Sequence, residues 1–204
     1  MLQCKKTLRG GPEGVMPKVE LALTAPRKGG LSMTLPLEIE RKFLVLSEEW
    51  RDGGTPMPIH QAYFMSDDGV AVRVRTVGEV GYLTVKAKKK KASQFEFEYR
   101  IPTDHAEFLI HTVCKRTPII KHRYRVRYAG LDWDVDVFEG ENAGLVIAEV
   151  ELVHEDQPVV LPPWVGAEVT DEKRFRNSQL YKKPVSAWKE DLPPPMAAAL
   201  RPVA

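Results

Sequence analysis

The sequence predicts a mainly β fold of the α+β type: an eight-stranded antiparallel β-barrel, closed or nearly closed, with a few covering helices. From Leu37 onward, short runs alternate apolar and charged residues, as strands with one buried face do. Gly and Asp residues stand between neighbouring runs, and such turns favour antiparallel pairing. Nearly every side chain on one strand face is charged, which suits the lumen of a barrel.

Composition indicates one folded domain. The chain has 204 residues, of which 43% are hydrophobic and 28% charged, with a formal net charge of +2. These values fit neither a disordered chain nor a strongly basic nucleic-acid binder, so no nucleic-acid partner is expected. No apolar run approaches the roughly 20 residues that cross a bilayer, which predicts a cytoplasmic protein with no membrane partner. Two cysteines, Cys4 and Cys114, provide no disulfide framework.

The strands follow one another with turn signals such as Asp67–Gly69 and Ala129–Gly130 between them. We expect eight strands, at residues 37–45, 60–65, 70–77, 81–87, 94–101, 119–128, 131–138 and 145–153.

Two helices are expected as covers for the apolar strand faces. Thr103 can cap a helix whose apolar residues recur at helical spacing through Cys114. A second helix is expected from Thr170 to about Lys183, where Pro184 would stop it.

The expected domain spans residues 35–184. Residues 1–34 show only one short apolar alternation, at Val19–Leu23, and are predicted to form a poorly structured N-terminal extension, with Met33 as an alternative start of translation. Residues 185–204 are rich in Pro and Ala and are predicted to form a flexible tail.

The charged strand face collects nine basic and nine acidic side chains. A flat sheet with a solvated face is the plain alternative, but the charges here are sorted by strand. Residues 84–91 and 115–127 hold eleven Lys and Arg and no acid, whereas residues 128–156 hold nine Asp and Glu and no Lys or Arg. Enclosing so many charges is costly unless they pair or serve a ligand. A polyphosphate with Mg²⁺ or Mn²⁺ matches this inventory, because bases hold phosphate oxygens and carboxylates hold hard cations.

The segment Leu37-Glu38-Ile39-Glu40-Arg41-Lys42 resembles the ExExK signature of the CYTH superfamily, also called triphosphate tunnel metalloenzymes. Later segments resemble the tunnel strands of that family in order: Val72–Arg75, Leu83–Lys86, Glu96–Glu98, Ile120–Arg123, Trp133–Phe138 and Ala148–Glu151. The resemblance covers residues 36 to 183 and is nearest to the short bacterial members. It implies an eight-stranded tunnel, a divalent metal, and hydrolysis or transfer at a triphosphate.

The resemblance also implies roles for individual residues. The implied metal ligands are Glu38, Glu40, Glu149 and Glu151. The implied phosphate-binding residues are Lys42, Arg73, Arg75, Lys86, Lys121, Arg123 and Arg125. Lys42, Glu96 and Glu98 are the candidate catalytic residues, with the two glutamates orienting a water or holding a second metal. The roles of Asp134, Asp136 and Lys173 stay open.

Other basic and metal-binding residue types receive a plainer interpretation. Beyond Lys86, the lysines at 88–91 are interpreted as a solvated loop rather than a nucleic-acid site. The five histidines show no ligand spacing and are interpreted as structural or exposed.

The functional expectation is an inorganic triphosphatase that splits tripolyphosphate into pyrophosphate and phosphate. A class IV adenylate cyclase, a thiamine triphosphatase and a non-catalytic polyphosphate binder remain as alternatives. The expected partner is a small triphosphate, and a homodimer is left open.

Overall fold

The computed structural model describes residues 35–51, 54–67, 69–90 and 93–201. The extension expected at residues 1–34 lies outside these described residues. Of the helices among them, none is both long and apolar enough to span a membrane.

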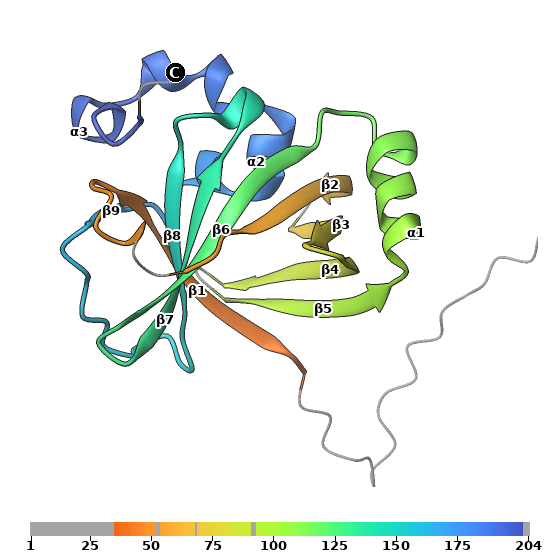
Figure 1. Ribbon diagram of the computed structural model, residues 1–204. Coiled ribbons are helices and arrows are strands. Elements are labelled where there is room, and N and C mark those ends of the chain that lie inside the picture. The colour runs from red at the N-terminus through yellow and green to blue at the C-terminus, as the bar shows by residue number, and fades with distance from the viewer. Residues whose placement is uncertain (1–34, 52–53, 68, 91–92, 202–204) are drawn as a thin grey trace, which may run out of the picture. The chain divides into compact units, whose positions relative to one another are not determined.

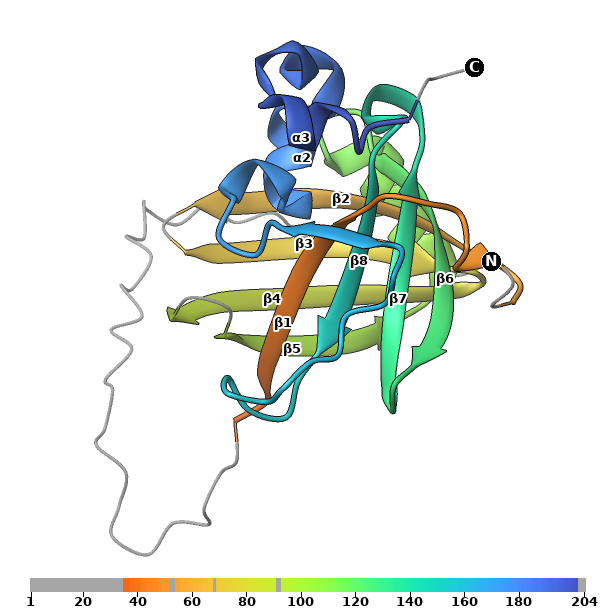
Figure 2. The ribbon, with the colours of Figure 1, turned by 90° about the vertical axis from the view of Figure 1, so that its left-hand side faces the viewer.

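Eight antiparallel strands close into a barrel, as the sequence predicted (Figure 1). They are β1 (Leu37–Val45), β2 (Met57–Asp67), β3 (Val70–Val77), β4 (Val80–Lys90), β5 (Ser93–Ile101), β6 (Ile119–Tyr128), β7 (Leu131–Phe138) and β8 (Val146–Glu151). Their order around the barrel is β5-β4-β3-β2-β6-β7-β8-β1, and β1 pairs back with β5. In Figure 2, β2 to β5 cross β1, β6, β7 and β8 steeply, as in a strongly tilted barrel.

Strand β1 closes the barrel by changing partners along its length. Leu37–Ile39 pair with β5, and Glu40–Leu44 pair with β8 on the opposite edge. A ninth strand, β9 (Val165–Glu168), pairs with the end of β1 and was not predicted from the sequence. Four residues with little alternation give too weak a local pattern for such a strand.

The predicted strand bounds differ from the structure mainly at strand ends. Strand β4 extends to Lys90, so Lys88 belongs to a strand and not to the predicted loop. Lys88 pairs with Gln94 of β5, although its side chain is exposed as expected. Backbone pairing with a neighbouring strand therefore outweighs the repulsion among consecutive lysines.

Helical segments cover part of the outer wall. The first predicted helix is present as α1 (Thr103–Phe108), continued by the π-helical turn η2 (Leu109–Val113). Gly81 allows this helix to approach closely, since a Cβ at Gly81 would lie 2.9 Å from the Cβ of Ala106. Ala106 and Ile110 are thereby buried against the barrel.

The second predicted helix is shorter than expected. Residues Lys173–Phe175 form a 3₁₀ turn, η4, and the α-helix α2 spans only Asn177–Lys182. Arg176 between them has an extended backbone, with ψ of 135°. Phe175, buried at 1% exposure, anchors the turn in the core and sets where the helix can begin.

The C-terminal segment is packed and is not the flexible tail that its composition suggested. It forms the turns η5 (Val185–Ala187) and η6 (Lys189–Asp191) and the short helix α3 (Pro194–Ala197). Val185, Trp188 and Leu192 are buried in the same apolar cluster as Phe175. Prolines limit helix length here, but they do not prevent the apolar side chains between them from packing.

Tryptophan 188 allows the packed C-terminal segment to be tested. Its ring meets Phe175 edge to face with centroids 5.4 Å apart, and its Nε1 donates to the Lys183 carbonyl. We expect Trp188→Ala to lower the free energy of unfolding by about 3–5 kcal/mol, as removal of large buried rings does. The thermal midpoint should fall by roughly 10 °C in differential scanning calorimetry.

The matched control is Lys189→Ala, which changes an exposed neighbour in the same segment. It should leave the midpoint within about 1–2 °C of wild type, since such surface changes are usually within about 0.5 kcal/mol. Equal midpoints for both variants would show that the segment does not contribute to the core.

Candidate functional site

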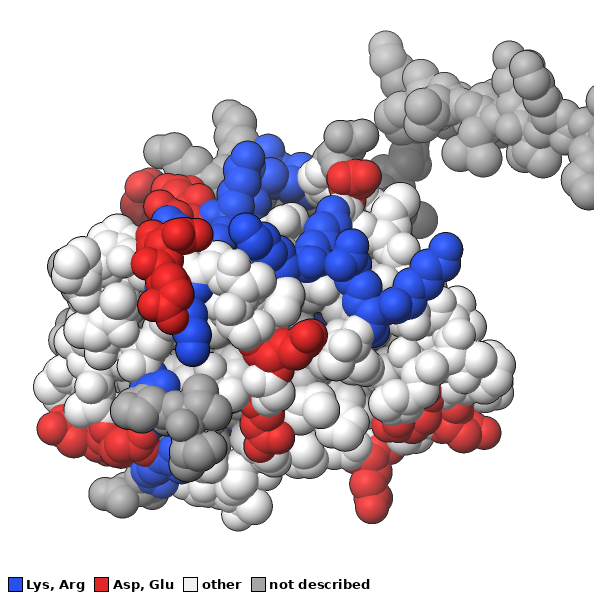
Figure 3. Space-filling view, turned by 90° about the horizontal axis from the view of Figure 1, so that it is seen from above, with Lys and Arg blue, Asp and Glu red and all other residues white. Residues whose placement is uncertain are grey.

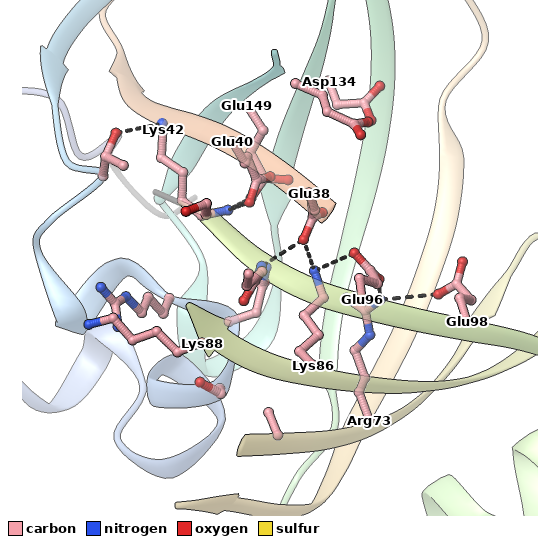
Figure 4. Close-up of a pocket in the computed structure, with 18 of the residues that line it drawn as sticks. Glu38, Glu40, Lys42, Arg73, Lys86, Lys88, Glu96, Glu98, Asp134 and Glu149 are labelled. Carbon is pink, nitrogen blue, oxygen red and sulfur yellow. Dashed lines mark hydrogen bonds and ion pairs between the residues drawn. The ribbon is translucent and has the colours of Figure 1, made fainter. Parts of the chain in front are cut away.

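A charged cavity of about 1240 Å³ occupies the barrel interior, and Figure 4 shows part of its lining. Period-two alternation turns the charged face of each strand inward, while the apolar face meets the outer clusters. The cavity is lined by every residue that the sequence assigned to a site: Glu38, Glu40, Lys42, Arg73, Arg75, Lys86, Glu96, Glu98, Lys121, Arg123, Arg125, Glu149 and Glu151. Barrel closure thus brings together residues that lie up to 113 positions apart, from 38 to 151.

Strands β1 and β8 place carboxylates directly opposite one another. Glu40 is in register with Glu151, and Lys42 is in register with Glu149. Like charges in direct cross-strand register destabilise a sheet unless something lies between them. Glu38 lies two residues from Glu40 on the same strand face, so three carboxylates converge on one part of the lumen wall.

The electrostatics of Glu40 show that this part of the wall is short of positive charge. Burial and repulsion from Glu149 raise the pKa of Glu40 to about 7, although Lys42 lies 2.8 Å from its carboxylate. Burial and the neighbouring Glu38 and Glu96 also raise the pKa of Glu151. A cation bound here would offset the burial and the repulsion that disfavour the ionised forms of Glu40 and Glu151.

Glu149 differs from the other carboxylates because two bases hold it. Its Oε1 accepts from Lys42 Nζ, and its Oε2 lies 2.7 Å from Arg123 Nη2. Burial would raise the pKa of Glu149, but Lys42, Arg123 and Lys121 outweigh burial and hold that pKa well below its usual range. Burial would lower the pKa of Lys42, yet Glu149 and Glu40 raise it.

The donor set around Glu40 fits a hard divalent cation. Glu38, Glu40 and Glu151 offer carboxylate oxygens, and no Cys or His lines the cavity among the described residues. Such oxygen sets favour Mg²⁺, Ca²⁺ or Mn²⁺ over softer metals. Glu38 currently accepts from Lys86 at 2.8 Å and from Gln94 at 2.6 Å, so both donors would share this carboxylate with a cation.

A second group of charges lies on β3, β4 and β5. Arg73 Nη2 donates to Glu96 at 3.1 Å and to Glu98 at 3.2 Å, and Arg75 donates to Glu98 at 3.0 Å. Lys86 lies 2.9 Å from Glu96 and bridges this group to Glu38 on β1. The result is a continuous row of alternating charges along the wall, visible in Figure 4.

The two glutamates of β5 are strong acceptors and weak bases. Burial would raise the pKa of Glu96. The positive charge of Lys86, a hydrogen bond with Glu38 and the positive charge of Arg73 outweigh burial and lower that pKa. The pKa of Glu98 is lowered in the same way, with Arg75 and Thr84 outweighing burial. Carboxylates held ionised in this way can orient a water or a base, but they have little tendency to take up a proton.

A third group, on β6 and β7, contains the most deeply buried charges. Lys121 and Asp136 are 1% and 0% exposed, and Lys121 Nζ donates to Asp136. Arg123 makes a bidentate pair with Asp136 at 2.7 Å and reaches Asp134 at 2.8 Å. Burial lowers the pKa of Lys121 to about 8, although the nearby Asp136 partly offsets this effect. Burial would also lower the pKa of Arg123, but Asp136 and Glu149 outweigh burial and raise it.

Basic side chains also lie at the mouths of the cavity. Arg125 and Arg127 line it but are 63% and 64% exposed in their side chains, so they belong to a rim. Lys88 and Lys173 line it from other elements. Figure 3 shows Lys and Arg side chains, with Asp and Glu beside them, on the face of the molecule seen from above.

Among the residues that the sequence analysis missed are Gln94 and Tyr63, which line the cavity, and the fully buried Thr84, which binds a glutamate of the lining. Gln94 donates to Glu38, and Thr84 donates to Glu98 at 2.7 Å. Period two was the available signal, because Gln94 shares a strand face with Glu96, and Thr84 shares one with Lys86. Their uncharged side chains did not stand out beside the ionised ones.

Comparisons with known proteins agree on one family. A family model described as the CYTH domain matches residues 36–184. An inorganic triphosphatase of Acetivibrio thermocellus is 40% identical over 153 residues, covering 75% of this chain and 98% of that protein. An inorganic triphosphatase of Nitrosomonas europaea is 34% identical over 149 residues, covering 70% and 95%. A crystal structure of an inorganic triphosphatase superposes with a TM-score of 0.54 at 34% identity, covering 71% of this chain and 97% of that one.

The buried charges of β6 and β7 generate a stability prediction. Asp136→Asn removes the carboxylate that pairs with the buried Lys121 and leaves Arg123 with Asp134 and Glu149 only, and breaking a buried pair in this way costs about 3–5 kcal/mol. We expect the thermal midpoint to fall by roughly 10 °C.

Asp132→Asn is the control, because Asp132 pairs with Arg127 at the rim, where the side chains are 58% and 64% exposed. Rim pairs contribute at most about 1 kcal/mol, so its midpoint should stay close to wild type. If the two variants lost the same stability, Asp136 would not be the structural partner inferred here.

Proposed function

Because this chain belongs to the CYTH domain family, we propose that it is a metal-dependent inorganic triphosphatase that hydrolyses tripolyphosphate to pyrophosphate and phosphate inside the barrel. The two curated relatives, both inorganic triphosphatases and 40% and 34% identical, support this activity. The enzyme is accordingly a hydrolase of phosphoanhydride bonds with a small phosphate compound as substrate.

One observation about the lumen carries the proposal. Bases and carboxylates alternate around a cavity of about 1240 Å³, and one carboxylate cluster lacks sufficient positive charge. A linear polyanion accompanied by a divalent cation supplies the charge that each part of this wall needs. A plain anion-binding protein would gain nothing from Glu38, Glu40 and Glu151, because these carboxylates repel its ligand.

The proposed phosphate-binding residues come from two parts of the wall, on either side of β2. Arg73, Arg75 and Lys86 extend from β3 and β4, and Lys121, Arg123 and Arg125 extend from β6. Guanidinium groups bind phosphate oxygens in bidentate fashion, and Lys acts as a point charge. Anchored by their acidic partners, these groups need little rearrangement when charge develops on the transferred phosphoryl group.

We propose that Glu38, Glu40 and Glu151 hold Mg²⁺ or Mn²⁺, with Glu149 positioned beside them. The cation would bridge phosphate oxygens and neutralise charge on the phosphoryl group undergoing transfer. Glu149 contributes chiefly by orienting Lys42 and Arg123, since both of its oxygens are engaged by these bases.

Lys42, Glu96 and Glu98 are the proposed catalytic residues. Lys42 remains protonated and lies between Glu40 and Glu149, where it can neutralise charge on a phosphate oxygen. Glu96 and Glu98, with their lowered pKa values, are suited to orient an attacking water. Positioning and charge neutralisation provide most of the catalysis in phosphoryl transfer, so no strong general base is required.

A substrate panel tests the activity. Tripolyphosphate, ATP, thiamine triphosphate and pyrophosphate are each incubated with Mg²⁺, with Mn²⁺ or with EDTA, and phosphate, pyrophosphate and cyclic AMP are measured separately. We expect equal yields of phosphate and pyrophosphate from tripolyphosphate, and loss of turnover in EDTA. Cyclic AMP from ATP would overturn the proposal in favour of a cyclase, and faster turnover of thiamine triphosphate would overturn the substrate assignment.

The metal assignment is tested by Glu40→Gln, which keeps the shape of the side chain and removes its charge. Loss of even an outer-shell partner costs about 10- to 100-fold in metal affinity or activity, so loss of a ligand should reduce kcat/KM at least that much. The Mg²⁺ concentration for half-maximal rate should rise as well.

Glu168→Gln is the matched control. Glu168 lies on β9 and pairs with Arg41 at 2.6 Å, and it does not line the cavity. Its variant should keep wild-type kinetics, and a Glu40→Gln enzyme with the same Mg²⁺ requirement as this control would refute the assignment.

A further inference from the structure

A group of metal-ligating side chains lies on the outer wall, away from the lumen. His60 on β2, Glu107 on α1 and His111 on η2 each offer one ligand atom, and these atoms all lie within 4.8 Å of one another. His111 Nε2 is 3.2 Å from a Glu107 carboxylate oxygen. None of the three lines the catalytic cavity.

The strand alternation of β2 places His60 outside. Ile59 and Gln61 are the buried neighbours of His60, and Gln61 pairs with Arg75, whose side chain lines the cavity. His60 therefore has the outward direction of Ala62, which packs in the apolar cluster with Ala106 and Ile110 of the covering helix. The helix that supplies Glu107 and His111 thus lies over this face of β2.

The helix presents its two ligands from adjacent turns. Glu107 and His111 are four residues apart, a spacing that brings two side chains onto the same helix face. The backbone changes to a π-helical turn at this point, with the Cys114 amide donating to the Leu109 carbonyl at 3.0 Å. Such π turns within helices occur frequently at functional sites.

The chemistry of the three donors favours zinc over the hard cations of the lumen. Two imidazoles and one carboxylate form a three-ligand set of the kind found in catalytic zinc sites, in which water takes the fourth position. Metal–ligand bonds of about 2.0–2.2 Å bring neighbouring donors to within roughly 3.5 Å of one another. Side-chain rotation alone can reach this spacing, because His111 is exposed and Glu107 is only half-buried.

We propose that His60, Glu107 and His111 form a zinc-binding site that fastens the α1–η2 helix to β2 on the outside of the barrel. The site is separate from the carboxylate cluster of the lumen in both location and ligand type. Bound Zn²⁺ cross-links residues 60 and 111, which the backbone connects only through three intervening strands, β3, β4 and β5, and the helix α1. The proposal does not depend on the triphosphatase activity.

The test measures Zn²⁺ binding to the full chain by competition with a chromophoric chelator, with Mg²⁺ in large excess to occupy the lumen carboxylates. Wild type should bind one Zn²⁺ that His111→Ala, Glu107→Gln and His60→Ala each weaken by at least about tenfold. His105→Ala is the control, because His105 is an exposed imidazole on the same helix and is not part of the group. This variant should bind Zn²⁺ as wild type does.

Two further measurements separate loss of a ligand from loss of fold. At a Zn²⁺ concentration a hundredfold above the wild-type Kd, the thermal midpoint of wild type should rise by about 5–10 °C, and that of His111→Ala should rise by about half as much or less. Co²⁺ should give visible absorption bands of a four-coordinate nitrogen and oxygen site in wild type and His105→Ala only. Equal Zn²⁺ affinity in wild type and His111→Ala, or equal losses in His105→Ala and His111→Ala, would overturn the proposal.

Discussion

Closure of the barrel through β1 is the constraint on which the rest of the structure depends. Leu37–Ile39 pair with β5 and Glu40–Leu44 pair with β8, so this strand connects β5 to β8 and closes the sheet into a barrel. An open sheet would expose its charged face to water, where Coulomb interactions are weak. Closure encloses the same side chains, strengthens every interaction among them, and makes their pairing a condition of folding.

The enclosed charges combine structural and binding roles in different proportions. Asp136 holds Lys121 and Arg123 in a buried group that resembles a core ion-pair network. Glu40 and Glu151 face each other in register, and burial raises both pKa values. The first group fixes the wall, whereas the second leaves a local excess of negative charge that a bound cation can neutralise. Stability and ligand affinity therefore come from the same interior but from different residues.

The two faces of the wall differ in the metal chemistry they offer. The lumen presents carboxylates without imidazoles among its described residues, and the outer surface under α1 and η2 presents His60 and His111 with Glu107. Hard cations favour the first set, and zinc favours the second. Strand alternation produces this separation, since adjacent residues such as His60 and Gln61 point to opposite sides of the barrel.

The sequence by itself determined the eight barrel strands and the residues that share the charged face, because alternation is a local property of each strand. It also determined the candidate lumen residues, from Glu38 on β1 to Glu151 on β8. Only the tertiary structure decided which carboxylates are paired, that β9 joins β1, and that Trp188 is buried. It also brought His60 within reach of His111, which no sequence spacing indicated. Each of these features depends on contacts between distant segments, and local patterns do not specify which distant side chains meet.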